Sequence, residues 1–193
     1  MEQSEILALY RDSGALLEGH FILSSGRHSA TYLQSALVLA DPRRAERLGA
    51  ALAAQVERAD YDLVVSPALG GLIIGHEVAR SLGLPFIFTE RKGGAMQLRR
   101  GFTVPRGARV LVVEDVITTG GSVRECMAVI AAHGGEPRQV LAVVDRAPAA
   151  GGRFAVPHRA LLAMDVQTFA TGDCPLCREG RLPAVRPGSR GAA

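Results

Sequence analysis

The sequence lacks several features that would direct a protein to a membrane, a secretory route or an oxidising compartment. No apolar run reaches the roughly 18 residues that a membrane-spanning helix needs. The first residues, MEQSEILALYRDSG, lack the basic and apolar regions of a secretory signal. The 193 residues include only 3 cysteines, an odd number that fits a reducing compartment better than a disulfide framework. We therefore expect a cytoplasmic protein without membrane segments.

Lysine is almost absent as well. The 22 lysine and arginine residues include a single lysine, Lys92. A lone lysine in an arginine-rich chain indicates a position where a compact ammonium serves better than a guanidinium, although chance placement is the alternative. The formal net charge of +3 suits a phosphorylated substrate. The basic residues form no stripe with aromatic residues, so we expect no nucleic-acid partner.

The C-terminal two-thirds of the chain alternates apolar runs with helical patterns. Strands are expected at 61–66, 86–90, 109–114 and 139–145, and helices at 71–82 and 122–133. The strand runs are apolar throughout, which indicates burial on both faces. Strands that alternate with helices predict an α/β fold with a doubly wound, mostly parallel sheet and flanking helices. Ligands bind such sheets at the carboxyl ends of the strands.

The two ends of the chain have other patterns. A short helix is expected at 6–17, broken at Gly14, and a second from Asp41-Pro42 to about Arg58, with proline at its first position. The end of the chain is rich in proline, glycine and arginine. We expect one domain over residues 1–193, with a small hood at about 1–40 plus part of the C-terminal segment, a core at about 41–170 and a tail at about 171–193.

The stretch VLVVEDVITTGGS, residues 110–122, carries the clearest chemistry. A buried strand runs into Glu114 and Asp115, and Thr118 to Ser122 then lead into a helix. Backbone N–H groups at a helix start bind anions, and glycines let the backbone approach a phosphate closely. Phosphate donors beside carboxylates that accept bonds from a sugar diol describe a site for a ribose 5-phosphate. The alternative is a helix capped by Ser122, with two solvated acids at a strand end.

This stretch resembles the phosphoribosyl pyrophosphate (PRPP) signature of type I phosphoribosyltransferases. No Gly-Lys-Ser/Thr follows the glycines, as a P-loop would require. The spacing of Gly70, Gly71 and Gly75 does not match a dinucleotide fingerprint. The resemblance implies that PRPP is bound by Glu114, Asp115, Val116, Ile117, Thr118, Thr119, Gly120, Gly121 and Ser122.

Three further segments, in the right order, resemble the orotate phosphoribosyltransferase family. They are Phe21 to Ser29 followed by Tyr32, Glu90-Arg91-Lys92, and Val144-Asp145-Arg146. The first resembles the family's hood segment, the second the residues before its mobile catalytic loop, and the third the Asp-Arg after a late strand. The resemblance extends from about residue 5 to about residue 170.

The resemblance implies transfer of the 5-phosphoribosyl group from PRPP to orotate, which forms orotidine 5′-monophosphate and pyrophosphate in UMP biosynthesis. Mg²⁺ is the implied cofactor, held mainly by PRPP, and no protein residue is assigned as its ligand. Lys92 and Arg91 are expected to bind PRPP and to stabilise charge on the leaving pyrophosphate. Together with Asp115, which holds the ribose beside Glu114, they are the expected catalytic residues.

Thr118 and Arg146 are the expected contacts of orotate. The planar fork of Arg146 matches a carboxylate, and the alternative for this residue is a surface ion pair with Asp145 or another acid. The resemblance also implies that Tyr32 lies near the base. It further implies that residues 66–71 form a loop that binds pyrophosphate, with strained backbone at the centre of the loop.

The segment 93–101 departs from the long mobile loop of many family members and resembles a short-loop subgroup. Its only cations are Arg99 and Arg100, and Ser24 stands where many members have a hood lysine. The resemblance implies a homodimer in which loop 93–101 closes over the partner's site and excludes water.

Two other functions remain open at this point. A PRPP-sensing regulator would bind nucleic acid, but the sequence contains no helix-turn-helix extension. An enzyme with a purine or another pyrimidine as its acceptor is the second, and Arg146 and the hood segment count against it.

Cys174-Pro175-Leu176-Cys177 is a C-x2-C pair, a spacing that one half of a zinc site would have. No second pair follows in this chain, so two pairs would have to meet across a dimer. The alternative is two reduced thiols near a surface turn. His76 and His133 are expected to be structural.

Overall fold

A computed structural model describes residues 1–23, 25–146 and 152–187, so Ser24 lies outside the described residues. Its centre is a sheet with the strand order β5-β4-β3-β6-β7-β8. The strands are β3 (Leu63–Pro67), β4 (Phe86–Lys92), β5 (Ala95–Leu98), β6 (Arg109–Ile117), β7 (Glu136–Asp145) and β8 (His158–Ala163). All neighbouring pairs are parallel except β4 and β5. The predicted mostly parallel sheet is confirmed.

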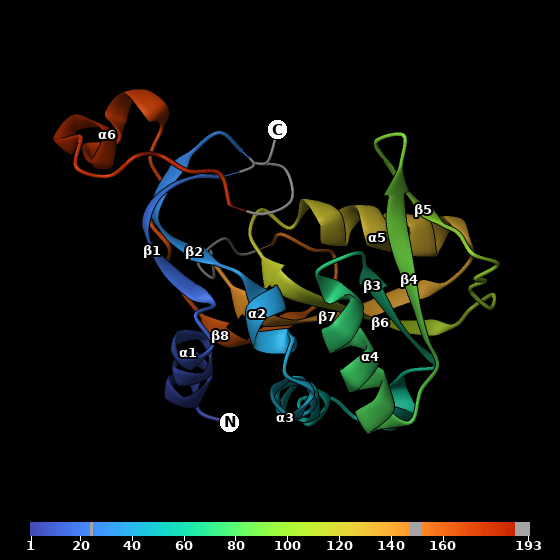
Figure 1. The fold of residues 1–193 in the computed structure, drawn as a ribbon. Coiled ribbons are helices and arrows are strands. Elements are labelled where there is room, and N and C mark those ends of the chain that lie inside the picture. Colours follow the sequence, from blue (N-terminus) through green and yellow to red (C-terminus); the bar gives the residue numbers. More distant parts are fainter. Residues whose placement is uncertain (24, 147–151, 188–193) are drawn as a thin grey trace.

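Helices cover both faces of this sheet (Figure 1), as the doubly wound prediction requires. The helices are α1 (Gln3–Asp12), α2 (Ser35–Leu39), α3 (Pro42–Ala53), α4 (Gly71–Leu82), α5 (Gly121–Ala132) and α6 (Pro175–Glu179). Helices α3 and α4 lie on one face and α5 on the other. No helix among the described residues is both long and apolar enough to cross a membrane.

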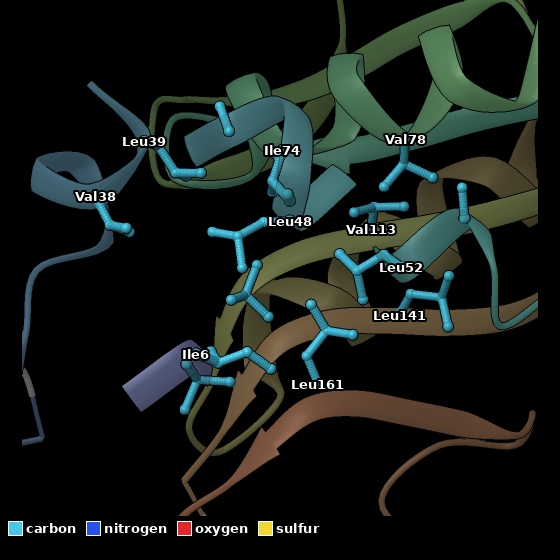
Figure 2. Close-up of a cluster of buried hydrophobic side chains, with 14 of the residues drawn as sticks. Ile6, Val38, Leu39, Leu48, Leu52, Ile74, Val78, Val113, Leu141 and Leu161 are labelled. Atoms are coloured by element: carbon cyan, nitrogen blue, oxygen red, sulfur yellow. The ribbon is translucent and has the colours of Figure 1, made fainter. Parts of the chain in front are cut away.

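The central strand β6 joins the two halves of the core. Leu111 and Val113 point into the layer under α3 and α4, whereas Val110 and Val112 point into the layer under α5. All four side chains are fully buried. Alternate residues of a strand face opposite sides, so a strand between two helical layers must be apolar at every position. Figure 2 shows the first layer, where side chains of α3 and α4 meet those of the sheet.

A second, two-stranded sheet forms the hood. Strand β1 (Leu16–Ile22) pairs antiparallel with β2 (His28–Leu33). Segments from the C-terminal part of the chain cover both edges of this hairpin, because Phe21 bridges to Val185 and His28 bridges to Phe169. This small sheet therefore contains residues from the N-terminal part of the chain and contacts residues 169 and 185.

Several predicted boundaries are wrong, and long-range pairing explains most of them. The first helix ends at Asp12, because Leu16 begins a strand that pairs with Leu33. Strand β6 continues to Ile117, because its last residues pair with β7. Helix α5 begins at Gly121, and its N-cap is Gly120 in the left-handed region (φ 75°), so Ser122 is not the cap. Helix α3 ends at Ala53, before the predicted end.

The predicted loop 93–101 is largely a β-hairpin. Strand β5 pairs antiparallel with β4. Thr89 lies opposite Leu98 at one end of the pairing, and Lys92 lies opposite Ala95 at the other. Gly93 and Gly94 make the turn with φ of 60° and 85°, and a two-residue hairpin turn favours positive φ at both positions. The hairpin extends away from the rest of the sheet at the edge of the molecule (Figure 1).

Replacement of Leu48 by alanine tests the layer under α3. Leu48 is 0% exposed within this layer, so Leu48→Ala should lower the free energy of unfolding by about 2–5 kcal/mol. Leu37→Ala is the matched control, because Leu37 is also helical but 46% exposed, and it should cost less than about 0.5 kcal/mol. Urea unfolding measures both. Equal losses would contradict this account of the core.

Candidate active site

Two adjoining cavities open where β6 runs into α5. The larger, of ≈ 860 Å³, lies between the sheet, the hood and the C-terminal segment. The smaller, of ≈ 250 Å³, lies at the start of α5. Val116, Thr118 and Thr119 line both cavities, so a ligand can extend from one into the other. Ile117 to Ser122 line the smaller cavity, and Asp115 and Arg146 line the larger. The fold therefore brings most of the predicted site residues together.

The smaller cavity has the features of an anion site. The first backbone N–H groups of α5 have no partner within the helix, and they lie at the positive end of its dipole. The carbonyl of Thr118 accepts a hydrogen bond from Nη1 of Arg153 at 3.1 Å, and that of Thr119 accepts one from Nη1 of Arg124 at 2.9 Å. These two arginines hold the carbonyl oxygens of the cradle and leave its N–H groups for a ligand.

Neighbouring side chains also fix the positions of Gly120 and Arg153. A β-carbon on Gly120 would lie 2.8 Å from the ring of Phe154, so only glycine fits there. Arg153 also pairs with the buried Asp145. Arg153 and Arg124 support the site, but the sequence analysis missed them. No local motif marks them, because they act on the carbonyls of another segment.

The two adjacent acids differ in environment. Glu114 is 7% exposed. Burial, the charge of Asp115 and a hydrogen bond with it raise the pKa of Glu114 well above its usual range. Asp115 lines the larger cavity and accepts a hydrogen bond from the N–H of Val116 at 2.8 Å. Within the described part of the chain no cation pairs with Asp115, so this side chain offers carboxylate oxygens to a sugar hydroxyl or to Mg²⁺, which prefers oxygen donors.

The predicted pyrophosphate loop follows β3 and lies against these acids. A β-carbon on Gly70 would lie 2.6 Å from Oδ1 of Asp115, and one on Gly71 would lie 3.0 Å from the carbonyl of Val113. The loop therefore needs both glycines to approach β6 this closely. The peptide bond between Ala68 and Leu69 is cis, and the side chain of Leu69 is 80% exposed.

Arg146 is a buried cation in the wall of the larger cavity. It is 8% exposed, and its Nε has no hydrogen-bond partner. Burial lowers the pKa of its guanidinium, while the nearby Tyr32 partly offsets this effect. The ion pair with Asp145 considered above does not form, because Asp145 pairs with Arg153 and lies 3.5 Å from Nε2 of His158. No acid among the residues described here neutralises Arg146, so the cavity favours an anionic ligand.

Residues from both ends of the chain close the larger cavity. Tyr32 of the hood lines it, and its ring lies 5.8 Å from that of Phe21, measured between centroids. Arg27 also lines it and is held by Thr168 through bonds of 2.8 Å and 2.6 Å. Arg186 lies in the same wall. Tyr32, which the resemblance places near the base, is thus part of this wall.

The cations on and beside the β4–β5 hairpin differ in their ion-pair partners and in whether they line a cavity. Arg91 lines the smaller cavity and pairs with Glu125 of α5 at 2.7 Å. Lys92 is exposed and lines neither cavity. Arg99 and Arg100 both pair with Glu90, at 3.4 Å and 2.9 Å. Of the three predicted catalytic residues, Arg91 and Asp115 thus lie in the cavities of this chain and Lys92 does not.

Comparison with known proteins agrees with this geometry. Residues 37–151 match the phosphoribosyl transferase domain family. The chain is 52% identical to an orotate phosphoribosyltransferase of Sphingopyxis alaskensis over 100% of both chains. It is 47% identical to one of Caldicellulosiruptor bescii over 98% of this chain and 99% of the other. The crystal structure of orotate phosphoribosyltransferase from Aeropyrum pernix has a TM-score of 0.69 at 29% identity and covers 82% of this chain and 93% of its own.

The two full-length relatives match across the signature at the end of β6, the hood and the Asp-Arg at the end of β7, which are segments that line the two cavities. The chain belongs to the orotate phosphoribosyltransferase family.

Proposed function

We propose that this chain transfers the 5-phosphoribosyl group of PRPP to orotate, forming orotidine 5′-monophosphate and pyrophosphate in pyrimidine biosynthesis, and that it does so in the cytoplasm. Membership of the family supports this reaction. The observation that carries the choice of acceptor is the buried guanidinium of Arg146, which lies beside the cradle and which no acid among the described residues neutralises. A neutral purine would leave this charge without a partner, whereas the carboxylate of orotate gives it a bidentate one.

The donor is held by three parts of the chain. The cradle from Thr118 to Ser122 binds the 5-phosphate through backbone N–H groups and hydroxyls. Asp115 and Glu114 accept hydrogen bonds from the ribose diol, and Val116 and Ile117 continue the strand that aligns them. Residues 66–71 bind the pyrophosphate. Carboxyl oxygens on one side of the ribose and an anion cradle on the other fix its orientation before bond breaking, which reduces the entropic cost of reaction.

The transition state carries positive charge on the ribose and growing negative charge on the pyrophosphate. The carboxylate of Asp115 lies next to the positive charge on the ribose. Arg91, with Lys92, stabilises the negative charge on the pyrophosphate. Thr118 and Arg146 hold orotate as an anion whose ring nitrogen faces the anomeric carbon, so little base catalysis is needed. The oxygen donors at Asp115 would suit Mg²⁺, which would neutralise charge on the leaving pyrophosphate when bound.

We also propose that the enzyme is a homodimer of single-domain subunits and that the 93–101 hairpin covers the partner's site. The exposed position of Lys92, outside both cavities of its own chain, supports this arrangement. So does the ion pairing of Arg99 and Arg100 with Glu90, which gives the hairpin a defined shape. A closed hairpin would keep water from the cationic ribose.

The proposed reaction predicts a loss of orotate absorbance that requires both PRPP and Mg²⁺, because glycosylation of the ring nitrogen changes its spectrum. Adenine should give no product. Arg146→Gln should raise the KM for orotate by about 10-fold or more, since a charge-assisted hydrogen bond contributes about 1.5–3 kcal/mol.

Arg138→Gln is the control, because Arg138 is exposed and, among the described residues, its one ion pair is with Glu136 on the surface. It should leave the KM unchanged. Transfer to adenine but not to orotate would overturn the acceptor, and an unchanged KM in Arg146→Gln would remove the role of this residue.

Lys92→Arg keeps the charge and replaces the ammonium by a guanidinium. We expect turnover to fall by at least ~10-fold, about 1.4 kcal/mol of barrier, because the bulkier group cannot reach the pyrophosphate in the same way. The melting temperature should not change, since Lys92 is exposed. Steady-state kinetics at saturating substrates measure the effect. Near-normal turnover would mean that the lone lysine stands there by chance.

Asp115→Asn removes the carboxylate from the donor site. We expect the Kd for PRPP to rise by about 10-fold or more, because hydrogen bonds to a charged acceptor are lost. Calorimetric titration with PRPP and Mg²⁺ measures this Kd. Asp12→Asn, an exposed position on α1, is the matched control. Equal affinity in both variants would contradict the role of Asp115.

A further inference from the structure

We propose that His20, His28, Cys174 and Cys177 of a single chain bind a structural Zn²⁺ ion. The ligand atoms of these four side chains lie within 4.8 Å of one another. The C-x2-C pair therefore does not need a second copy of the chain to complete four ligands, because the hood supplies the other two. This site lies apart from the two cavities and does not depend on the proposed reaction.

The nitrogen–sulfur distances match a tetrahedral Cys2His2 site. Nε2 of His20 lies 3.7 Å from Sγ of Cys174 and 3.6 Å from Sγ of Cys177, and Nδ1 of His28 lies 3.3 Å from Sγ of Cys177. Zn–N bonds of about 2.0 Å and Zn–S bonds of about 2.3 Å at tetrahedral angles place N and S about 3.5 Å apart. Two soft thiolates and two imidazoles in this geometry favour zinc over the hard cations Mg²⁺ and Ca²⁺.

The hydrogen bonds around the cluster orient both imidazoles as ligands. Nδ1 of His20 lies 3.2 Å from the carbonyl of Leu182. A carbonyl only accepts, so Nδ1 carries the proton and Nε2 directs its lone pair at the cysteines. Nε2 of His28 lies 3.5 Å from Oγ1 of Thr171, which leaves Nδ1 facing inward. Metal-bound histidines show this arrangement, with the outer nitrogen bonded to an oxygen that fixes the ring.

The fold brings the two histidines together on the hood hairpin. Their ring centroids are 4.9 Å apart, and the facing nitrogens, Nε2 of His20 and Nδ1 of His28, share a hydrogen bond of 2.7 Å. Zinc would replace the proton of this bond, and the two nitrogens would move apart to about 3.3 Å, their separation in a tetrahedral site. The register of β1 and β2 shifts between Glu18 and Phe21, the stretch that contains His20. Such bulges redirect a side chain. His20, His28 and Cys174 are buried and Cys177 is exposed, so the ion is enclosed with one side open for entry.

The segment that carries the cysteines needs an anchor of this kind. No residue of α6 is buried, and α6 lies at the margin of the molecule beside β1 (Figure 1). The segment therefore has little apolar surface to hold it, although Cys174 is 0% exposed. Small units without a core of their own are commonly stabilised by a structural metal. Zinc would tie residues 174–177 to the hood and, through them, the C-terminal wall of the larger cavity.

The test is the metal content of the full chain, purified without added zinc and measured by mass spectrometry of the elements. We expect about one zinc per chain. Cys177→Ser and His20→Asn should lower this content at least ~10-fold under a competing chelator. The matched controls are Cys126→Ala and His133→Asn, a thiol and an imidazole outside the cluster, and both should keep the metal.

A second measurement on the unmodified sequence covers the case in which the variants fail to fold. The chain is stripped with a chelator under reducing conditions and titrated with Co²⁺. Tetrahedral thiolate coordination should give visible absorption bands that saturate at about one equivalent and vanish when Zn²⁺ is added. The melting temperature should fall on stripping and recover with Zn²⁺.

Three results would overturn the proposal. The first is a chain that neither contains zinc nor takes up Co²⁺ in a defined ratio. The second is zinc that stays at the unmodified level in both Cys177→Ser and His20→Asn. The third is a Cys174–Cys177 disulfide in zinc-free protein that was never exposed to an oxidant, which would assign the pair to redox chemistry.

Discussion

The parallel pairing of β6 with β7 beyond Glu114 is the constraint on which the site depends. Val116 pairs with Val144 and Ile117 with Asp145, and the N–H of Arg146 then donates to the carbonyl of Ile117 at 2.9 Å. The last residues of these two strands thus set the phosphate cradle and the buried guanidinium side by side. Had β6 ended at Glu114, where its apolar run ends, nothing in the sheet would hold Arg146 beside the cradle.

Charge neutralisation decides which arginines remain available to a ligand. Arg153 pairs with Asp145, Arg91 with Glu125, and Arg100 with Glu90. Among the described residues Arg146 has no such acid, although it is more buried than Arg91 or Arg100. An unpaired buried charge is costly, so this arrangement is favourable when an anion occupies the cavity. The affinity of the site for an anion is therefore built into its unliganded state.

The elements that could be predicted from the sequence are those specified by local signals. Helix α4 has the predicted bounds, because Gly83 in the left-handed conformation ends it before Pro85. The signature after β6 also predicted which residues line the smaller cavity. Strand β5 and the hood hairpin were missed, because their short sequences mix apolar and polar residues without a regular pattern, and pairing with other segments holds them in place.

The four-residue cluster shows the same limit. The C-x2-C pair is a local pattern and was found, whereas its partner His20 lies 154 residues from Cys174 along the chain and carries no motif. A search of all histidines for the two missing ligands would have included His20 and His28. The sequence alone could not choose among the five histidines, since only the folded hood brings these two together.

The pairing of the hood with the C-terminal segment has a consequence for a truncated chain. The sheet from β3 to β8 is complete by residue 163, and every residue that lines the smaller cavity lies before that point. The wall of the larger cavity includes Val166, Thr168 and Arg186, which come after it. A chain cut after β8 would therefore keep the smaller cavity, whereas the larger cavity would lose one wall and open to water.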